Sequence, residues 1–144
     1  MPSEKTQQKI IKVAKDNNLL IISLGFSLPF CEKECEVLYP DCGPREFLGY
    51  IESSECVITD SYHGMLFSII YNKQFFEIKR EYKVYDQSSR QQTIIDRLGL
   101  QERYIVSEIE DISLDKKIDY NLVVEKLQEF RDISLKYLKN SIEN

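Results

Sequence analysis

Residues 56–70 constrain the fold of this chain more than any other segment. Residues 56–59 (CVIT) form a short, largely β-branched run that is typical of a buried strand. Apolar side chains then recur at helical spacing, and Asp60 and Ser61 are residue types that favour the start of a helix. The segment therefore predicts a strand that turns directly into a helix. His63, the only histidine of the chain, lies at this corner.

The predicted corner is a candidate site for an anion. A helix N-terminus offers unpaired backbone N–H groups and a positive partial charge, and open α/β sheets bind ligands at the carboxyl ends of their strands. His63 would donate a hydrogen bond to the anion or carry a proton. Gly64 would let the backbone approach a ligand closely, or let the helix pack tightly on the sheet. The alternative is that His63 is a polar residue near a helix start without a chemical role.

The other segments alternate between helical and strand patterns. Helices are expected at residues 4–16, 44–53, 90–98 and 120–141, and further strands at residues 19–24, 74–78 and 104–106. This order predicts an α/β fold, a Rossmann-like parallel sheet with helices on both faces. Residues 25–40 are expected to be irregular, and residues 81–89 to form a polar loop over the site.

Both ends of the chain lead to expectations. The sequence begins on a helix, whereas such a unit normally places a strand before it, so we expect residues 1–144 to be one domain of a longer protein with its opening strand missing. An exposed sheet edge invites pairing with another chain, which predicts a homodimer through that edge or a tendency to aggregate. The last helix is expected to bury an apolar face formed by Leu122, Val123, Leu127, Phe130, Leu135 and Leu138.

Composition excludes several classes of protein. The net charge is −5 and no stripe of Lys and Arg follows any expected element, which argues against nucleic-acid binding. No apolar run is long enough to span a membrane and the N-terminus lacks a secretory signal, so we predict a cytoplasmic protein. Three of the four cysteines follow a C-x3-C-x6-C spacing with no histidine among them, unlike paired zinc knuckles, and no metal site is predicted. They are Cys31, Cys35 and Cys42, and the fourth is Cys56.

Several motifs, taken together, carry a resemblance to a known family. The first are residues 43–51 (GPREFLGYI), residues 57–64 (VITDSYHG) and residues 67–73 (FSIIYNK). They are followed by Ser89-Arg90, residues 96–100 with Arg103, and residues 118–120 with Arg131, Ser134 and Tyr137-Leu138. With these motifs the chain resembles the C-terminal half of polysaccharide pyruvyl transferase family proteins over nearly its whole length.

The resemblance implies a fold and an activity. Such proteins are similar to GT-B glycosyltransferases, with two Rossmann-like domains and a cleft between them, so this chain would be the second domain and would need the first for activity. The implied reaction transfers an enolpyruvyl unit from phosphoenolpyruvate to a sugar of a cell-surface polysaccharide, with no cofactor. The family histidine, which is His63 here, would lie at the donor phosphate as the catalytic residue.

One position departs from the family pattern. Many members carry an arginine two residues before the histidine, where a guanidinium would bind phosphate or carboxylate in bidentate fashion. This chain has Ser61 there, a weaker and uncharged anion ligand. We therefore expect Arg90 or Arg80 to supply the missing charge. The substrate-binding residues predicted on these grounds are Ser61, Tyr62, Gly64 and Arg90, and Tyr82 is a further candidate for the cleft wall.

Two other functions remain open from the sequence. A GT-B-like glycosyltransferase domain that uses a nucleotide sugar would place a diphosphate at the same corner. A non-catalytic fragment or binding module would keep the fold without the chemistry.

Overall fold

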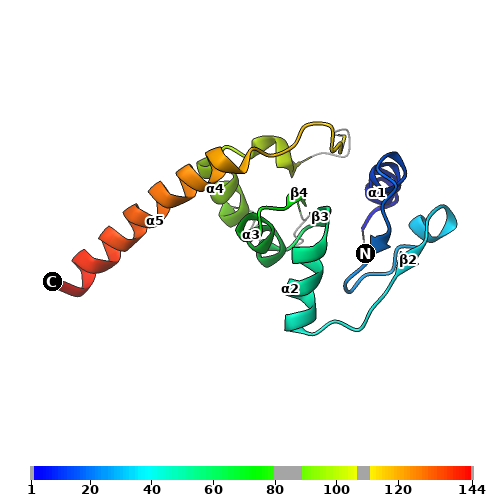
Figure 1. The fold of residues 1–144 in the computed structure, drawn as a ribbon, viewed down its shortest axis with the longest axis horizontal. Helices are drawn as coiled ribbons and strands as arrows, with labels where there is room; N and C mark the ends of the chain where they lie inside the picture. The colour runs from blue at the N-terminus through cyan, green and yellow to red at the C-terminus, as the bar shows by residue number, and fades with distance from the viewer. Residues whose placement is uncertain (1, 80–88, 107–110, 144) are drawn as a thin grey trace.

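The computed structural model describes residues 2–79, 89–106 and 111–143 (Figure 1). Arg80, Tyr82 and the rest of the loop expected over the site lie outside the described residues, except for Ser89, which begins a helix.

Five α-helices and five strands are described, and every strand pair is parallel. The helices are α1 (Glu4–Asp16), α2 (Pro44–Ser53), α3 (Tyr62–Ile70), α4 (Ser89–Leu98) and α5 (Tyr120–Glu143). The strands are β1 (Ile21–Ile22), β2 (Val37–Leu38), β3 (Cys56–Thr59), β4 (Gln74–Ile78) and β5 (Tyr104–Ile105). The predicted fold class, a Rossmann-like α/β arrangement of parallel strands flanked by helices, is confirmed.

The sheet itself differs from the prediction of a single continuous sheet. β1 pairs with β2 alone, and β3, β4 and β5 form a separate three-stranded sheet in that order. β2 lies in residues 25–40, which were expected to be irregular, and β1 is two residues long where six were expected. Short strands make few backbone hydrogen bonds, so their extent depends on pairing with distant segments rather than on local sequence.

The three-stranded sheet is covered on both faces. Adjacent residues of a strand point to opposite faces, and on β4 both Phe75 and Phe76 are buried. Phe75 packs with residues of α3, α4 and the start of α5, whereas Phe76 packs with Val13 of α1 and with Ile112. The central strand therefore organises two cores, one on each side.

The small sheet is covered on one face only. Ile21 packs with Ile11 of α1 and with Leu28 in a third core. The next residue along each strand, Ile22 on β1 and its register partner Leu38 on β2, is more than 40% exposed. Apolar side chains thus remain uncovered on this face.

The predicted buried face of α5 is wrong for most of its length. Val123 is buried and Leu127 is partly buried against the core, but Leu122, Leu135 and Leu138 are each more than half exposed. Figure 1 shows why, because the helix leaves the body of the molecule after its first turns and projects away from it. Within the described residues, the apolar side chains of its later turns, such as Leu135 and Leu138, are therefore left largely exposed.

Among the described residues, no helix combines the length and the apolar character that crossing a membrane requires.

Candidate functional site

The corner between β3 and α3 forms as the sequence predicts. Ser61 is the N-cap of α3, with an extended backbone, and its hydroxyl accepts a hydrogen bond of 3.4 Å from the backbone N–H of Gly64. The N–H of Ser61 in turn donates to the hydroxyl of Thr59, the last residue of β3, at 3.0 Å. Strand end and helix start are therefore tied together by two short-range hydrogen bonds.

Gly64 is buried, and its position explains why only glycine fits. A Cβ atom placed there would lie 2.5 Å from the Thr59 Oγ1 atom and 3.2 Å from its Cβ atom. Of the two roles proposed for Gly64, the structure therefore shows tight packing of helix on strand. The Ser68 hydroxyl, one turn later, is buried and donates to the Gly64 carbonyl at 2.7 Å.

His63 lies on the exposed side of the same turn. It is the second residue of α3, and its ring meets the Tyr62 ring edge to face with centroids 5.8 Å apart. Tyr62 and His63 are the first two residues of α3, and the first N–H groups of an α-helix have no acceptor within the helix. An exposed imidazole thus lies with these donors at the positive end of the helix.

Arg90 reaches this corner from a different helix. It lies in the first turn of α4, and its guanidinium carbon stands 5.0 Å from the centre of the Tyr62 ring, a cation–π contact. Tyr62 therefore touches both His63 and Arg90. The structure brings together all five predicted site residues, although they come from two separate helices.

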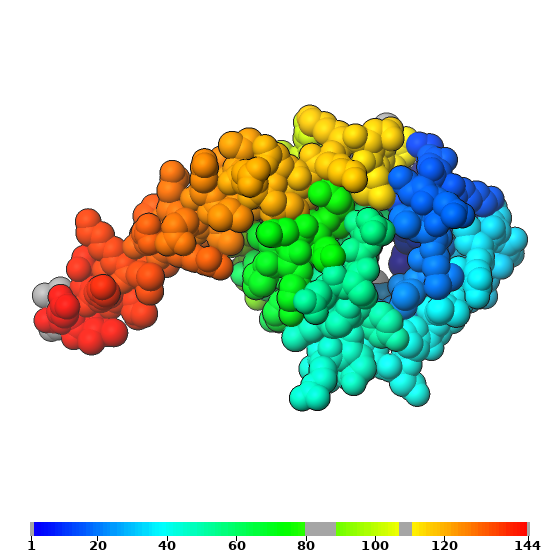
Figure 2. All heavy atoms as spheres, viewed as in Figure 1, coloured from blue at the N-terminus to red at the C-terminus, as the bar shows by residue number. Residues whose placement is uncertain are grey.

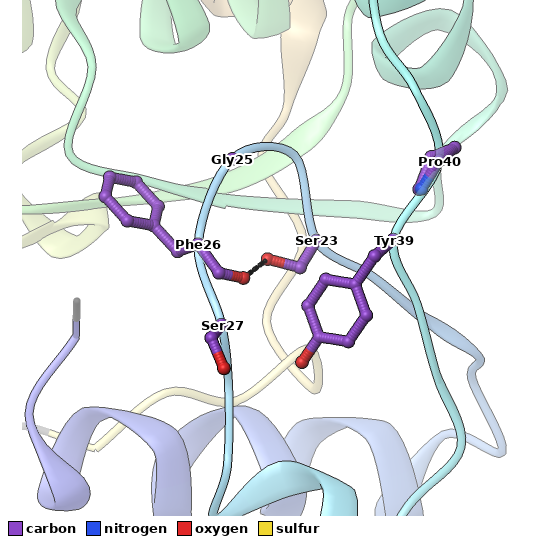
Figure 3. A pocket seen from close by; sticks show the side chains of 6 residues that line it. All are labelled: Ser23, Gly25, Phe26, Ser27, Tyr39 and Pro40. Atoms are coloured by element: carbon purple, nitrogen blue, oxygen red, sulfur yellow. Dashed lines mark hydrogen bonds between the residues drawn. The ribbon is translucent and has the colours of Figure 1, made fainter.

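Two hollows lie elsewhere, after β1 and β2. Figure 3 shows the first, which encloses about 380 Å³ between the turn that follows β1 and the segment that follows β2. Its lining includes Phe26 and Tyr39, and the turn is closed by a hydrogen bond of 2.6 Å from the Ser23 hydroxyl to the Phe26 carbonyl. The second hollow, of about 450 Å³, continues past Pro40 to the start of α2.

The hollows differ from the corner in charge. Neither is lined by His63 or by any lysine or arginine, and Asp41 is the one charged residue in their linings. Phe47 of α2, which lines the second hollow, packs edge to face on Phe67 of α3 at 6.5 Å, so the hollow and the corner share a helix contact. An apolar, aromatic lining suits a neutral ligand, whereas the corner suits an anion.

Sequence reasoning missed these hollows. Their residues lie in residues 25–40 and just beyond, where no strand was expected after residue 24. A usable signal was present, because a short apolar pair, Val37-Leu38, is followed closely by Pro40 and by the Gly43-Pro44 helix start.

The cysteines are all free thiols. Burial raises the pKa of the Cys31 thiol to about 11 and that of Cys56 to about 12. Within residues 2–79, 89–106 and 111–143, no three His, Cys, Asp or Glu side chains are grouped so that they could hold a metal ion.

The fold and the corner together define an α/β protein of the doubly wound class, in which a helix N-terminus with an exposed histidine follows the carboxyl end of a strand. More specifically, the chain belongs to the polysaccharide pyruvyl transferase family, whose sequence model, "Polysaccharide pyruvyl transferase", matches residues 6–81. That match covers just over half of the chain and includes β3 and the His63 corner, but it ends before Arg90 and the later motifs. No curated protein and no solved structure matches the chain.

Proposed function

We propose that this chain is the donor-binding domain of a pyruvyl transferase that moves the enolpyruvyl unit of phosphoenolpyruvate to a sugar hydroxyl of a cell-surface polysaccharide. Family membership supports the transfer of a pyruvyl group to a polysaccharide. The observation that carries the donor assignment is the exposed His63 at the open end of α3, with Arg90 held beside it through Tyr62.

The donor carries two anionic groups, and the corner offers two kinds of partner. The open N–H groups at the start of α3 would bind phosphate oxygens, and the Arg90 guanidinium would bind phosphate or carboxylate. The guanidinium would then replace the family arginine whose position Ser61 occupies. This arrangement explains how a serine at that position is compatible with an anionic donor.

The chemistry requires a proton donor. When the first sugar oxygen bonds to the central carbon of the enolpyruvyl unit it gives up its hydroxyl proton, and the terminal methylene takes up a proton and becomes a methyl group. The second sugar oxygen then bonds to the same carbon and gives up its proton to the departing phosphate, which leaves with its bonding electron pair as the ketal closes. An imidazole can both hold and release a proton, so His63 is suited to deliver the proton to the methylene or to protonate the departing phosphate. The first domain of the enzyme would supply the opposite wall of the cleft.

Donor binding by the 144-residue chain tests this proposal. We expect phosphoenolpyruvate to raise the melting temperature in a concentration-dependent way, because a ligand that binds only the folded state stabilises it. His63→Ala and Arg90→Gln should each reduce this shift by at least half. Arg45→Gln, which removes an exposed arginine from the first turn of α2, is the matched control and should leave the shift unchanged.

The same assay distinguishes the competing functions. Stabilisation by a UDP-sugar but not by phosphoenolpyruvate would make the chain a nucleotide-sugar glycosyltransferase domain. A shift with phosphoenolpyruvate that survives both His63→Ala and Arg90→Gln would move the donor site away from this corner. No shift with either ligand would favour a binding module without the donor chemistry.

A further inference from the structure

The two sheets have unpaired edges on either side of a break. Within the described residues, β1 is paired only with β2 and β3 only with β4, so each strand keeps one free backbone edge. Figure 2 shows an opening between the N-terminal elements, in blue and cyan, and α2, in teal. A sheet of parallel strands rarely leaves such edges bare, because unpaired N–H and C=O groups template pairing with another strand.

The strand order indicates what belongs at the break. Doubly wound sheets commonly have the order 3-2-1-4-5-6. β2 and β1 correspond to strands 3 and 2 of this order, and β3, β4 and β5 correspond to strands 4, 5 and 6. Strand 1, which would lie between β1 and β3, has no counterpart among the described strands.

Helix α1 is placed as the crossover from such a strand would be. Its Val13 packs with Phe76 of the three-stranded sheet, while Ile11 packs with Ile21 of the two-stranded sheet, so the helix lies across both. Its second turn lies beside the segment that follows β1, because the N–H of Phe30 donates to the Gln7 side-chain oxygen at 3.0 Å. α1 therefore begins at the level where a strand parallel to β1 would end.

The side chains next to the break are less buried than their type predicts. The four residues of β3, Cys56–Thr59, are all half-buried, whereas the three central residues of β4 are fully buried. On the other side of the break, Leu20 is 51% exposed and Ile22 is 41% exposed. Strands of a parallel sheet are normally buried on both faces, so these apolar groups are those that an inserted strand would shield.

We propose that the break between β1 and β3 is a binding slot for one extended apolar strand that comes from polypeptide outside residues 1–144 and lies parallel to both. Its carboxyl end would lie next to the start of α1, and its backbone would pair with β1 on one side and β3 on the other. The slot does not depend on the proposed pyruvyl transfer, since it rests on the sheet and not on the His63 corner.

A designed strand attached to the N-terminus tests the slot. The fusion places Thr-Val-Val-Ile-Val and a two-residue Asp-Gly link before Pro2, and the matched control carries proline at the second and fourth strand positions. We expect the strand fusion to raise the melting temperature by about 3 °C or more over the control. Amide hydrogen exchange of β1 and β3 should slow at least tenfold in the fusion only.

A second measurement tests the slot even if the fusion protein fails to fold. The same strand, added as a free peptide to the unfused chain, should slow exchange at the β1 and β3 amides, and the proline peptide should not. Equal effects of strand and control, or none from fusion and peptide alike, would overturn the proposal. So would an unfused dimer whose β1 and β3 amides are already protected at the interface, because a second copy would then be the occupant.

Discussion

The molecule has two strand-to-helix corners that differ in construction. At the corner from β3 to α3, a serine hydroxyl caps the helix and a glycine seats it directly on the strand end. At the corner from β2 to α2, Gly43 is the N-cap and no side chain caps the helix there. Two hollows lie beside this corner.

This difference separates two ways of building a site. The corner at α3 is fixed by contacts between residues two to five positions apart, so its geometry is local, and it holds His63 outward on a rigid base. The corner at α2 takes its shape from the segments that follow β1 and β2, for example where the Tyr39 hydroxyl accepts from the Leu28 N–H at 2.9 Å. We therefore expect the first to resist change and the second to tolerate it.

The thiols of Cys42, before α2, and of Cys56, at the start of β3, should show the largest contrast. Cys42 is exposed beside α2, whereas Cys56 begins β3 and burial raises its pKa from 9.0 to about 12. At pH 8 the folded state holds about a thousandfold less Cys56 thiolate than the unfolded chain, an effect partly offset by the higher nucleophilicity of a weaker acid. We expect iodoacetamide to label Cys56 on the order of a hundredfold more slowly in the folded than in the urea-unfolded protein, as followed by peptide mass spectrometry.

Cys42 serves as the internal reference, since folding should change its labelling little. Labelling of folded Cys56 should accelerate as the pH rises toward 12. The same pKa shift stabilises the fold below pH 9, and this contribution is lost as the pH rises from 9 toward 12, because the folded state holds its proton longer than the unfolded one. Equal labelling of the two thiols in the folded protein would show that the start of β3 is as open as the α2 corner.

Substituting alanine for glycine should have opposite effects in the two helices. Gly64→Ala forces a methyl group to within 2.5 Å of the Thr59 hydroxyl, which is itself held by the Ser61 N–H, and we expect a loss of about 2–3 kcal/mol in the free energy of unfolding. Gly49→Ala in α2 is the matched control. No atom lies within 4 Å of the added methyl, so this change should stabilise the protein by about 0.5–1 kcal/mol.

Urea denaturation of both variants measures this contrast, and a third variant locates its cause. Thr59→Ala in the Gly64→Ala background removes the atoms that clash, so the two destabilisations should sum to more than the double variant loses. Strict additivity would mean that contact with Thr59 is not what excludes a side chain at position 64.

The contrast between local and distant contacts explains how much of the fold could be predicted from the sequence. The Ser61 cap and the start of α2 at Pro44 depend on a few neighbouring residues, and both were predicted and are observed. The exposure of His63 and its contact with Tyr62 follow from the same local geometry. The catalytic and binding roles of these residues remain predictions.

Features set by distant partners escaped sequence reasoning. The apolar pair Val37-Leu38 before Pro40 is a weak signal, because two residues form a strand only when β1 pairs with them. The half-burial of β3 likewise depends on which segments lie beside it. The helical period of α5 predicts an apolar face correctly, yet periodicity cannot say whether a surface lies opposite that face. Ile70 of α3 is likewise 56% exposed although it continues an apolar stripe.

Removing the serine cap at α3 and adding one at α2 should give the smallest changes in the free energy of unfolding. Ser61→Ala removes the hydroxyl that accepts from Gly64, and we expect a loss of about 0.5–1 kcal/mol, at the low end for a cap because the hydrogen bond is 3.4 Å long. Gly43→Ser supplies the missing cap at α2 and should add a few tenths of a kcal/mol. Gly43 already has the extended backbone of a cap residue, and Glu46 stands at the third helical position of a capping box.

The Glu46 side chain provides the control for this exchange. An added Cβ at position 43 would lie 2.7 Å from the Glu46 Oε2 atom, the far end of a flexible side chain that can rotate to accept from the backbone N–H of residue 43. Glu46→Ala should therefore cancel part of the gain from Gly43→Ser while costing little in the parent chain. If Gly43→Ser instead destabilises the protein by as much as Ser61→Ala does, the α2 corner is as tightly specified as the α3 corner, and the distinction between a local and a tolerant corner fails.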